Sequence, residues 1–234
     1  QFVGRDAELR VLEDALARAQ AAEGPVLGIA ADAGTGKSRL CFEFLARCRA
    51  RGCRVWEGRA VAHGRNIPLL PILDLFRAAF DVTTQDDART VREKVAGRVL
   101  VTEAAQADSL PLVFELLGVG DARHPLATLD GPARQRRLLQ LLTRQLQAAD
   151  PAAGPTVVLL EDLHWLDAAS SEFLAALVAA CAGMRCLLLF NYRPEHVVTG
   201  VPLTRWRALS LAPLGPEAMS ALLAGRLGQD ASLG

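Results

Sequence analysis

Residues 25–38, PVLGIAADAGTGKS, join a short apolar run to a glycine-rich turn that ends in a lysine and a serine. The apolar run, residues 25–30, has no polar alternation, which is typical of a strand buried on both faces of a sheet. The residues that follow the turn, RLCFEFLARCR (39–49), form a helical pattern. A buried strand, a glycine-rich turn and a helix in this order predict an α/β fold.

The turn has the composition of a phosphate-binding loop. Gly34 and Gly36 let the backbone turn tightly, so that successive amide groups can point inward and bind an anion at a helix N-terminus. Lys37 would place its ammonium against the β- and γ-phosphates, and Ser38 would offer its hydroxyl to Mg²⁺. The predicted nucleotide contacts are Ala33, Gly34, Thr35, Gly36, Lys37, Ser38 and Arg39.

Two features of composition bear on this loop. Ala31 stands where the GxxxxGK[ST] pattern has its first glycine, and we expect the change to be tolerated if φ is negative there. The chain has only two lysines, Lys37 and Lys94, among 26 basic residues. A chain that otherwise uses arginine therefore has a lysine, Lys37, at the position where a compact ammonium suits the phosphates. The alternative is a glycine-rich turn with a solvated lysine.

Residues 156–167, TVVLLEDLHWLD, form a second apolar strand, which ends in two acids. The carboxyl ends of parallel strands face the ligand, so Glu161 and Asp162 are expected near the phosphates. We assign Glu161, with Asp162, to metal binding and Asp162 to orienting the attacking water, although the order of roles could be reversed. The alternative is a carboxylate pair that caps the following turn.

The residues after these acids, and a third strand end, add further candidates. His164 either contacts the phosphate end or packs in the turn, and Trp165 is expected to pack. The stretch LLLFNYRPE (187–195) ends a strand with Asn191 and Arg193. Arginine binds phosphate oxygens in a two-point fashion, so Arg193 could reach the γ-phosphate and assist catalysis. The alternative is an exposed arginine in a loop.

The rest of the chain fits one domain over residues 1–234. A weaker strand is expected at 53–58, and helices at 7–20, 37–51, 131–149 and 168–182, the last capped by Asp167. Helical patterns also occur around 69–80, 86–105 and 109–118. We therefore predict a three-layer P-loop sandwich with a central parallel sheet. A helical insertion at about 66–150 separates the second strand from the acidic strand.

Composition limits the partners and the compartment. The formal net charge of the 234 residues is zero, so no overall field attracts nucleic acid or an anionic membrane. Five cysteines without a CxxC pair indicate reduced, mostly buried thiols in a cytoplasmic protein. The apolar stretch 173–190 is interrupted by Arg185 and is interpreted as a buried helix and a strand rather than a membrane span. Because the chain begins with Gln1, we expect a piece of a longer protein.

Four motifs in order resemble a known family: FVGRDAEL (2–9), the phosphate loop, LLEDLHWLD (159–167) and LLLFNYRPE (187–195). They are similar to the signal-transduction ATPases with numerous domains, a branch related to AAA+ and Orc1-like ATPases. Residues 57–77 and 86–100 resemble the ATPase module that follows class III adenylate/guanylate cyclase domains in bacterial regulators. Related modules precede LuxR-type DNA-binding domains.

The resemblance implies a nucleotide site that uses ATP or ADP with Mg²⁺. Val3, Gly4 and Arg5 would line the adenine pocket, and Arg193 would be the sensor arginine. The family fold would place the phosphate-loop strand beside the acidic strand. A helical lid would start at about 215–234 and be cut short. The implied partners are attached cyclase or helix-turn-helix signalling domains and self-association, without membrane or direct nucleic-acid contact.

These observations favour an ATP-binding switch domain that hydrolyses ATP slowly. One rival is a module that holds nucleotide without turnover. Another is a scaffold whose helical insertion binds a partner while the nucleotide site is vestigial. The sequence shows no second metal-binding aspartate pair of the cyclase type, which argues against cyclase activity. A kinase that acts on a small molecule would leave Val3–Arg5 and Arg193 unexplained.

Overall fold

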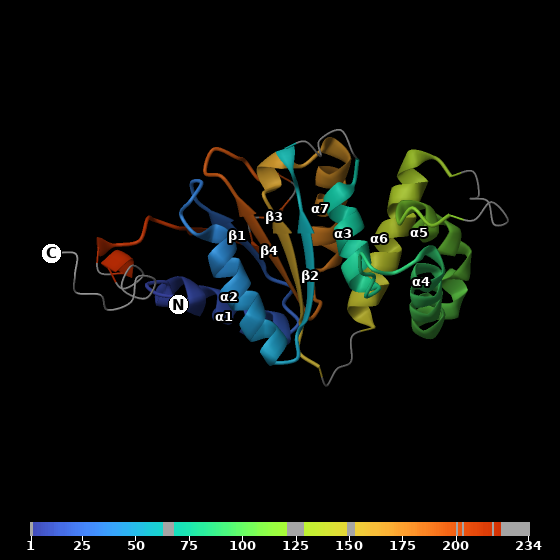
Figure 1. Cartoon of the computed structure of the whole chain (residues 1–234), viewed down its shortest axis with the longest axis horizontal. Helices are drawn as coiled ribbons and strands as arrows, with labels where there is room; N and C mark the ends of the chain where they lie inside the picture. Colours follow the sequence, from blue (N-terminus) through green and yellow to red (C-terminus); the bar gives the residue numbers. More distant parts are fainter. Residues whose placement is uncertain are drawn as a thin grey trace.

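The computed structural model describes residues 2–62, 68–120, 129–148, 153–199, 201–202, 204–216 and 218–220, with only the backbone for residues 103–106. A five-stranded parallel sheet lies between two layers of helices (Figure 1). Helices α1 (Asp6–Gln20) and α2 (Lys37–Ala50) cover one face. Helices α3 (Leu70–Ala79) and α7 (Ala168–Ala180) cover the other, which confirms the three-layer α/β prediction.

Apart from β5, which the sequence did not predict, the remaining strands and helices follow the predicted order along the chain. The strands are β1 (Val26–Ala30), β2 (Arg54–Arg59), β3 (Thr156–Glu161), β4 (Cys186–Tyr192) and β5 (Trp206–Ser210). Helices α4 (Ala88–Glu103), α5 (Leu110–Leu116) and α6 (Gly131–Gln147), with the 3-10 turn η2 (Ala104–Ser109), lie between β2 and β3. A second 3-10 turn, η3 (Leu163–Trp165), follows β3 directly.

The order of the strands corrects one expectation. The sheet runs β2-β3-β4-β1-β5, so the phosphate-loop strand β1 is not beside the acidic strand β3. Strand β4 lies between them, because all seven of its residues are buried and need neighbours on both sides as well as on both faces. The pairing sets Ile29 opposite Asn191 and Arg59 opposite Glu161 at the carboxyl edge.

Successive residues of the central strands pack on opposite faces of the sheet, as pleating requires. In β3, Val157 and Leu159 join the core under α1 and α2, whereas Val158 and Leu160 join the core under α3 and α7. This double coverage explains why the strands are uniformly apolar.

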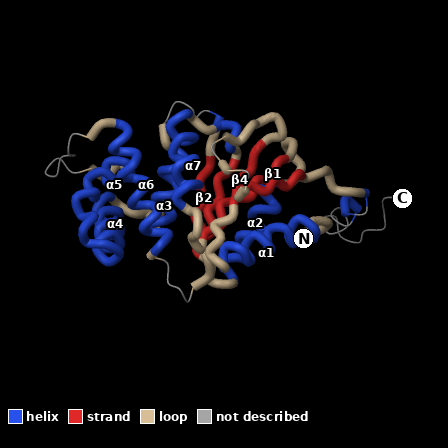
Figure 2. The backbone as a smooth tube through the Cα atoms, turned by 180° about the vertical axis from the view of Figure 1, so that it is seen from behind, coloured by secondary structure: helices blue, strands red, loops and turns tan. Residues whose placement is uncertain are grey.

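The insertion between β2 and β3 is helical, as predicted, although the ends proposed at 66 and 150 lie outside the described residues. Helix α6 begins after Asp130, whose carboxylate accepts a hydrogen bond from the Ala133 amide at 2.7 Å and caps the first turn. Helices α4 and α5 lie beyond α3 and α6, further from the sheet (Figures 1 and 2).

Strand β5 was not predicted from the sequence. It pairs only with β1 at the edge of the sheet, and three of its five residues are exposed, so its sequence lacks the apolar run of the inner strands. The predicted lid at about 215–234 lies mostly outside the described residues, which contain only a short helical stretch near 216–220.

The apolar stretch at 173–190 divides as predicted. Helix α7 ends at Ala180, Gly183 turns the chain with a φ of 72°, and β4 starts at Cys186. No helix in the described ranges combines the length and the apolar character needed to cross a membrane. Asp167 caps α7, since its Oδ1 accepts a hydrogen bond from the Ser170 amide at 2.9 Å. All five cysteines are buried and free.

Candidate functional site

The glycine-rich turn joins β1 to α2 at the carboxyl edge of the sheet. Gly34 and Gly36 adopt positive φ angles of 79° and 97°, which residues with a side chain rarely adopt. A Cβ built on either glycine meets nothing within 4 Å, so the space beside the loop is open. Ala31 is buried and lacks a positive φ, which explains why alanine is tolerated at the first position of the pattern.

Lys37 begins α2, and its side chain folds back under the loop. Its Nζ donates hydrogen bonds to the carbonyl oxygens of Ala31 at 2.5 Å and Asp32 at 2.9 Å, and the residue is only 9% exposed. Within the described part of the chain, no carboxylate oxygen lies within 4.0 Å of this ammonium. The first turn of α2 also holds no acid, unlike that of α1. The helix N-terminus therefore presents uncompensated positive charge.

The two acids at the end of β3 lie beside an arginine that the sequence analysis did not single out. Arg59 Nε lies 3.2 Å from Asp162 Oδ2 and 3.9 Å from Glu161 Oε2. Arg59 ends β2, the strand paired with β3, and its side chain is 63% exposed. Its place beside the acids follows from the β2–β3 pairing, which the sequence does not reveal. In the sequence, the only signal that could have drawn attention to Arg59 is the motif EGRA (57–60) in which it lies.

Asn191 ties the acidic strand end to the centre of the sheet. Its Oδ1 accepts a hydrogen bond from the Asp162 amide at 2.8 Å, and its Nδ2 lies 3.9 Å from Cys41 Sγ on α2. The side chain is 1% exposed. Asp162 itself has a left-handed backbone, with φ 59° and ψ 45°, so the amide bond helps to hold a conformation that is costly for a residue with a Cβ. Sequence analysis named Asn191 but gave it no role.

Burial raises the pKa of Glu161 above its ordinary value, and the charge of Arg59 opposes that rise. The neighbouring carboxylate of Asp162 raises it further. Arg59 therefore offsets part of the unfavourable burial of Glu161, and a further positive charge beside the two acids would do the same.

Trp165, which follows the acids closely in the chain, contacts both His164 and Arg193. The imidazole and indole centroids are 5.0 Å apart, and the Arg193 guanidinium lies 5.9 Å from the Trp165 ring. Burial lowers the pKa of His164, and the charges of Arg193 and Lys37 lower it further, whereas Asp162 raises it. Trp165 thus packs as expected, but against Arg193, which also lies 3.9 Å from Glu195.

The other predicted site residues divide between the loop and its surroundings. Ser38 is exposed on the first turn of α2, whereas Arg39 pairs with Glu43 along the same helix and stacks over Phe42. Arg5 is buried against the loop and donates to the Thr35 carbonyl at 2.9 Å. The adenine pocket assigned to residues 3–5 stays a prediction.

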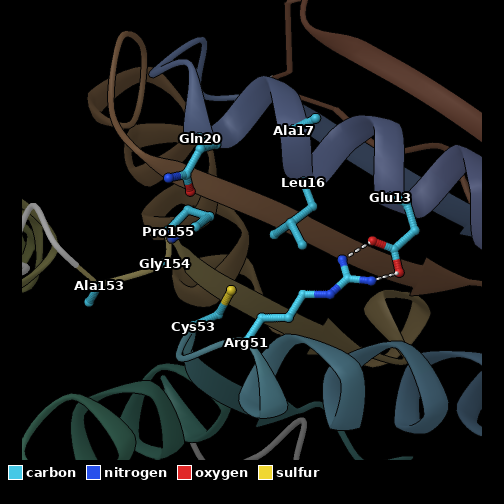
Figure 3. Close-up of a pocket in the computed structure, with 9 residues that line it drawn as sticks. All are labelled: Glu13, Leu16, Ala17, Gln20, Arg51, Cys53, Ala153, Gly154 and Pro155. Atoms are coloured by element: carbon cyan, nitrogen blue, oxygen red, sulfur yellow. Dashed lines mark hydrogen bonds and ion pairs between the residues drawn. The ribbon is translucent and has the colours of Figure 1, made fainter.

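A pocket of about 420 Å³ lies at the opposite, amino-terminal edge of the sheet (Figure 3). The residues that line it come from α1, the end of α2 and the segments leading into β2 and β3. Its charged groups, Glu13 and Arg51, pair with each other, so the pocket does not offer a free cation to a phosphate.

The model of the AAA ATPase domain family matches residues 1–189. The chain belongs to the AAA ATPase domain family. The structure of the Aeropyrum pernix Orc1 protein in complex with DNA covers 97% of this AAA ATPase domain at a TM-score of 0.51 and 18% identity, with 50% of that chain covered. At this identity the likeness shows the fold alone, a three-layer P-loop sandwich.

The uncharacterized protein R02095 of Rhizobium meliloti (strain 1021) is 27% identical over 218 residues, or 92% of the chain. The chain spans about a fifth of that protein, since the match covers 21% of its length.

Proposed function

We propose that this chain is a switch domain that binds ATP with Mg²⁺ and hydrolyses it slowly. The nucleotide would bind at the carboxyl edge of the sheet, with its phosphates over the loop of Gly34, Thr35 and Gly36. The AAA ATPase family and the strand–loop–helix geometry support the binding step.

The buried ammonium of Lys37 carries the proposal. Among the described residues, this ammonium is 9% exposed, donates hydrogen bonds to two backbone carbonyls and has no carboxylate within 4.0 Å, so an anion beside it would be favoured. A phosphate group beside the loop would supply that anion, and the open space next to Gly34 and Gly36 gives it room. Lys37 would then exchange its carbonyl partners for phosphate oxygens.

The residues at the strand ends fit a magnesium ion. Ser38 offers a hydroxyl on the first turn of α2, and Glu161 and Asp162 offer carboxylate oxygens, the ligands that Mg²⁺ prefers. The ion, when bound, neutralises charge on the phosphates. Arg59 now supplies the positive charge beside Glu161 and Asp162. It would have to give up at least part of its contact with these two acids when the ion binds.

Hydrolysis would use Asp162, whose backbone amide donates a hydrogen bond to Asn191. The Asp162 carboxylate would accept a hydrogen bond from a water and orient it toward the γ-phosphorus, as a general base or a positioning group. Asn191 holds the Asp162 backbone for this role. Arg193, whose guanidinium lies over the Trp165 ring, would move toward the γ-phosphate and assist catalysis.

The biological output would be conformational. ATP-bound and ADP-bound forms would present different surfaces to attached signalling domains, such as a cyclase catalytic or helix-turn-helix domain, or to a second copy. The bacterial regulators suggested by residues 57–77 and 86–100 provide that context. Free buried cysteines suit a reducing cytoplasm.

Phosphate release by wild type and Asp162→Asn tests turnover. We expect slow, Mg²⁺-dependent release by wild type and at least a tenfold loss in the variant, in line with about 10²–10⁴-fold for general-base catalysis. ATP affinity, measured by calorimetry on both proteins, should change little. No release by wild type would leave a nucleotide-holding module, equal release from the two proteins would exclude Asp162 from the hydrolytic step, and no binding by wild type would contradict the proposal.

A further inference from the structure

Arg5 bridges three separate parts of the chain although it precedes the first helix. Its Nη2 donates to the Thr35 carbonyl of the phosphate loop at 2.9 Å and to the Ala212 carbonyl at 2.8 Å. Its Nη1 pairs with Glu8 at 2.8 Å. The residue is 6% exposed. Because a buried guanidinium must find partners for its donors, this geometry fixes the loop and the chain beyond β5 to the same group.

A second contact joins the same segments. Gly4 has a φ of 72°, and a Cβ built on it would lie 2.4 Å from Ala218 Cβ and 3.4 Å from Leu214 Cδ2. The chain around Gly4 therefore packs directly against residues that follow β5. We call residues 211–216 and 218–220 the exit segment.

The bond from Arg5 to Thr35 also orients the loop. The C=O of one residue and the N–H of the next point in opposite directions across a trans peptide, and none of the described peptide bonds is cis. Holding the Thr35 carbonyl toward Arg5 therefore turns the Gly36 amide to the other side of the peptide. Like Gly34, the other glycine of this turn, Gly36 has open surroundings, because a Cβ built on it meets nothing within 4 Å.

We infer that Arg5 is a positioning residue that couples occupancy of the phosphate loop to the order of the exit segment. Its guanidinium presets the Thr35–Gly36 peptide for an incoming triphosphate, and the same group holds the Ala212 backbone. Binding that fixes the loop therefore also fixes the exit segment. This coupling rests on the proposed nucleotide binding, but it assigns Arg5 a task other than lining an adenine pocket.

Hydrogen exchange of the whole chain, with and without ATP·Mg²⁺, tests the coupling in wild type, Arg5→Ala and Arg5→Lys. In wild type, ATP should slow exchange in peptides covering the exit segment. Arg5→Ala should bind ATP about tenfold more weakly, the loss expected for one charged hydrogen bond. At saturating ATP it should no longer protect the exit segment. Arg5→Lys keeps the positive charge, but its ammonium cannot bridge the Thr35 and Ala212 carbonyls as the guanidinium does. This variant replaces Arg5→Ala in the test if Arg5→Ala does not fold.

Arg205 supplies the matched control. It also donates to backbone carbonyls, those of Gly24 at 3.0 Å and Val178 at 2.6 Å, but at the amino-terminal edge of the sheet. Arg205→Ala should lower stability and leave the ATP-dependent protection of the exit segment intact.

Three results would overturn the inference. Full protection of the exit segment in Arg5→Ala and Arg5→Lys would show that the coupling does not pass through Arg5. Binding of ATP by wild type without any change in the exit segment would overturn the coupling alone. Absence of ATP binding to wild type in calorimetry would overturn the proposed function together with the coupling.

Discussion

Replacing Asn191 with leucine tests how the acidic end of β3 is held. The substitution keeps roughly the shape of a buried side chain and removes the oxygen that accepts the Asp162 amide hydrogen bond at 2.8 Å. It also removes the long contact with Cys41 Sγ. Asp162 then keeps a left-handed backbone without the hydrogen bond to residue 191 that helps to hold it.

The expected cost follows from these contacts. A lost hydrogen bond contributes about 1 kcal/mol, and a buried donor left without a partner costs about 1–3 kcal/mol. The Asp162 amide is only partly buried, and its backbone can relax from a conformation that costs up to about 1–2 kcal/mol. We therefore expect the free energy of unfolding to fall by about 1–2 kcal/mol, which lowers Tm by about 2–8 °C in a domain of this size.

Thermal denaturation and phosphate release, measured on the same preparations, check this prediction. ATP affinity should be nearly unchanged, because Lys37 and the loop glycines are untouched, whereas hydrolysis should fall with the placement of Asp162. An unchanged Tm together with unchanged hydrolysis in Asn191→Leu would refute the tie.

Three further perturbations probe the charges and thiols. Arg59→Gln should raise the pKa of Glu161 further in a carbon-13 NMR titration, because Arg59 is the main group stabilising its ionised form; an unmoved pKa would be inconsistent with the contact. Glu161→Gln should stabilise the protein relative to wild type, and the difference in free energy of unfolding should grow as pH rises through the raised folded pKa of Glu161, since wild type then holds a buried carboxylate. A difference in stability that does not change with pH between about 4 and 8 would contradict this. Burial raises the pKa of Cys41 and Cys48 to about 12, so a disulfide reagent at pH 8 should label neither until guanidinium unfolds the protein, and rapid labelling of the native chain would argue against their burial.

The phosphate loop was predictable because all its physics is local: a buried strand, two glycines, a lysine and a helix within a few consecutive residues. The partners of the acids were not, since Arg59 and Asn191 reach them only through strand pairings between segments far apart in the chain. For the same reason the sequence could not place β4 between β1 and β3.

Strand β5 illustrates a different limit. Its exposed edge position removes the requirement for an apolar run, so WRALS resembles a loop in sequence and becomes a strand only by pairing with β1. Arg5 illustrates a third limit. Its assignment to an adenine pocket stays a prediction, whereas its hydrogen bonds to the backbone carbonyls of Thr35 and Ala212 join segments far apart in the chain, which the sequence could not reveal.

Calorimetric titration with ATP·Mg²⁺ of wild type, Lys37→Ala and Lys94→Ala tests the central claim most directly. Lys94, the only other lysine, pairs with Asp86 far from the loop in sequence, so it controls for loss of a positive charge. We predict one site in wild type and in Lys94→Ala. Lys37→Ala should bind about tenfold to a hundredfold more weakly, as expected for a charged hydrogen bond. Equal affinity of all three proteins would contradict a triphosphate site at the buried ammonium of Lys37.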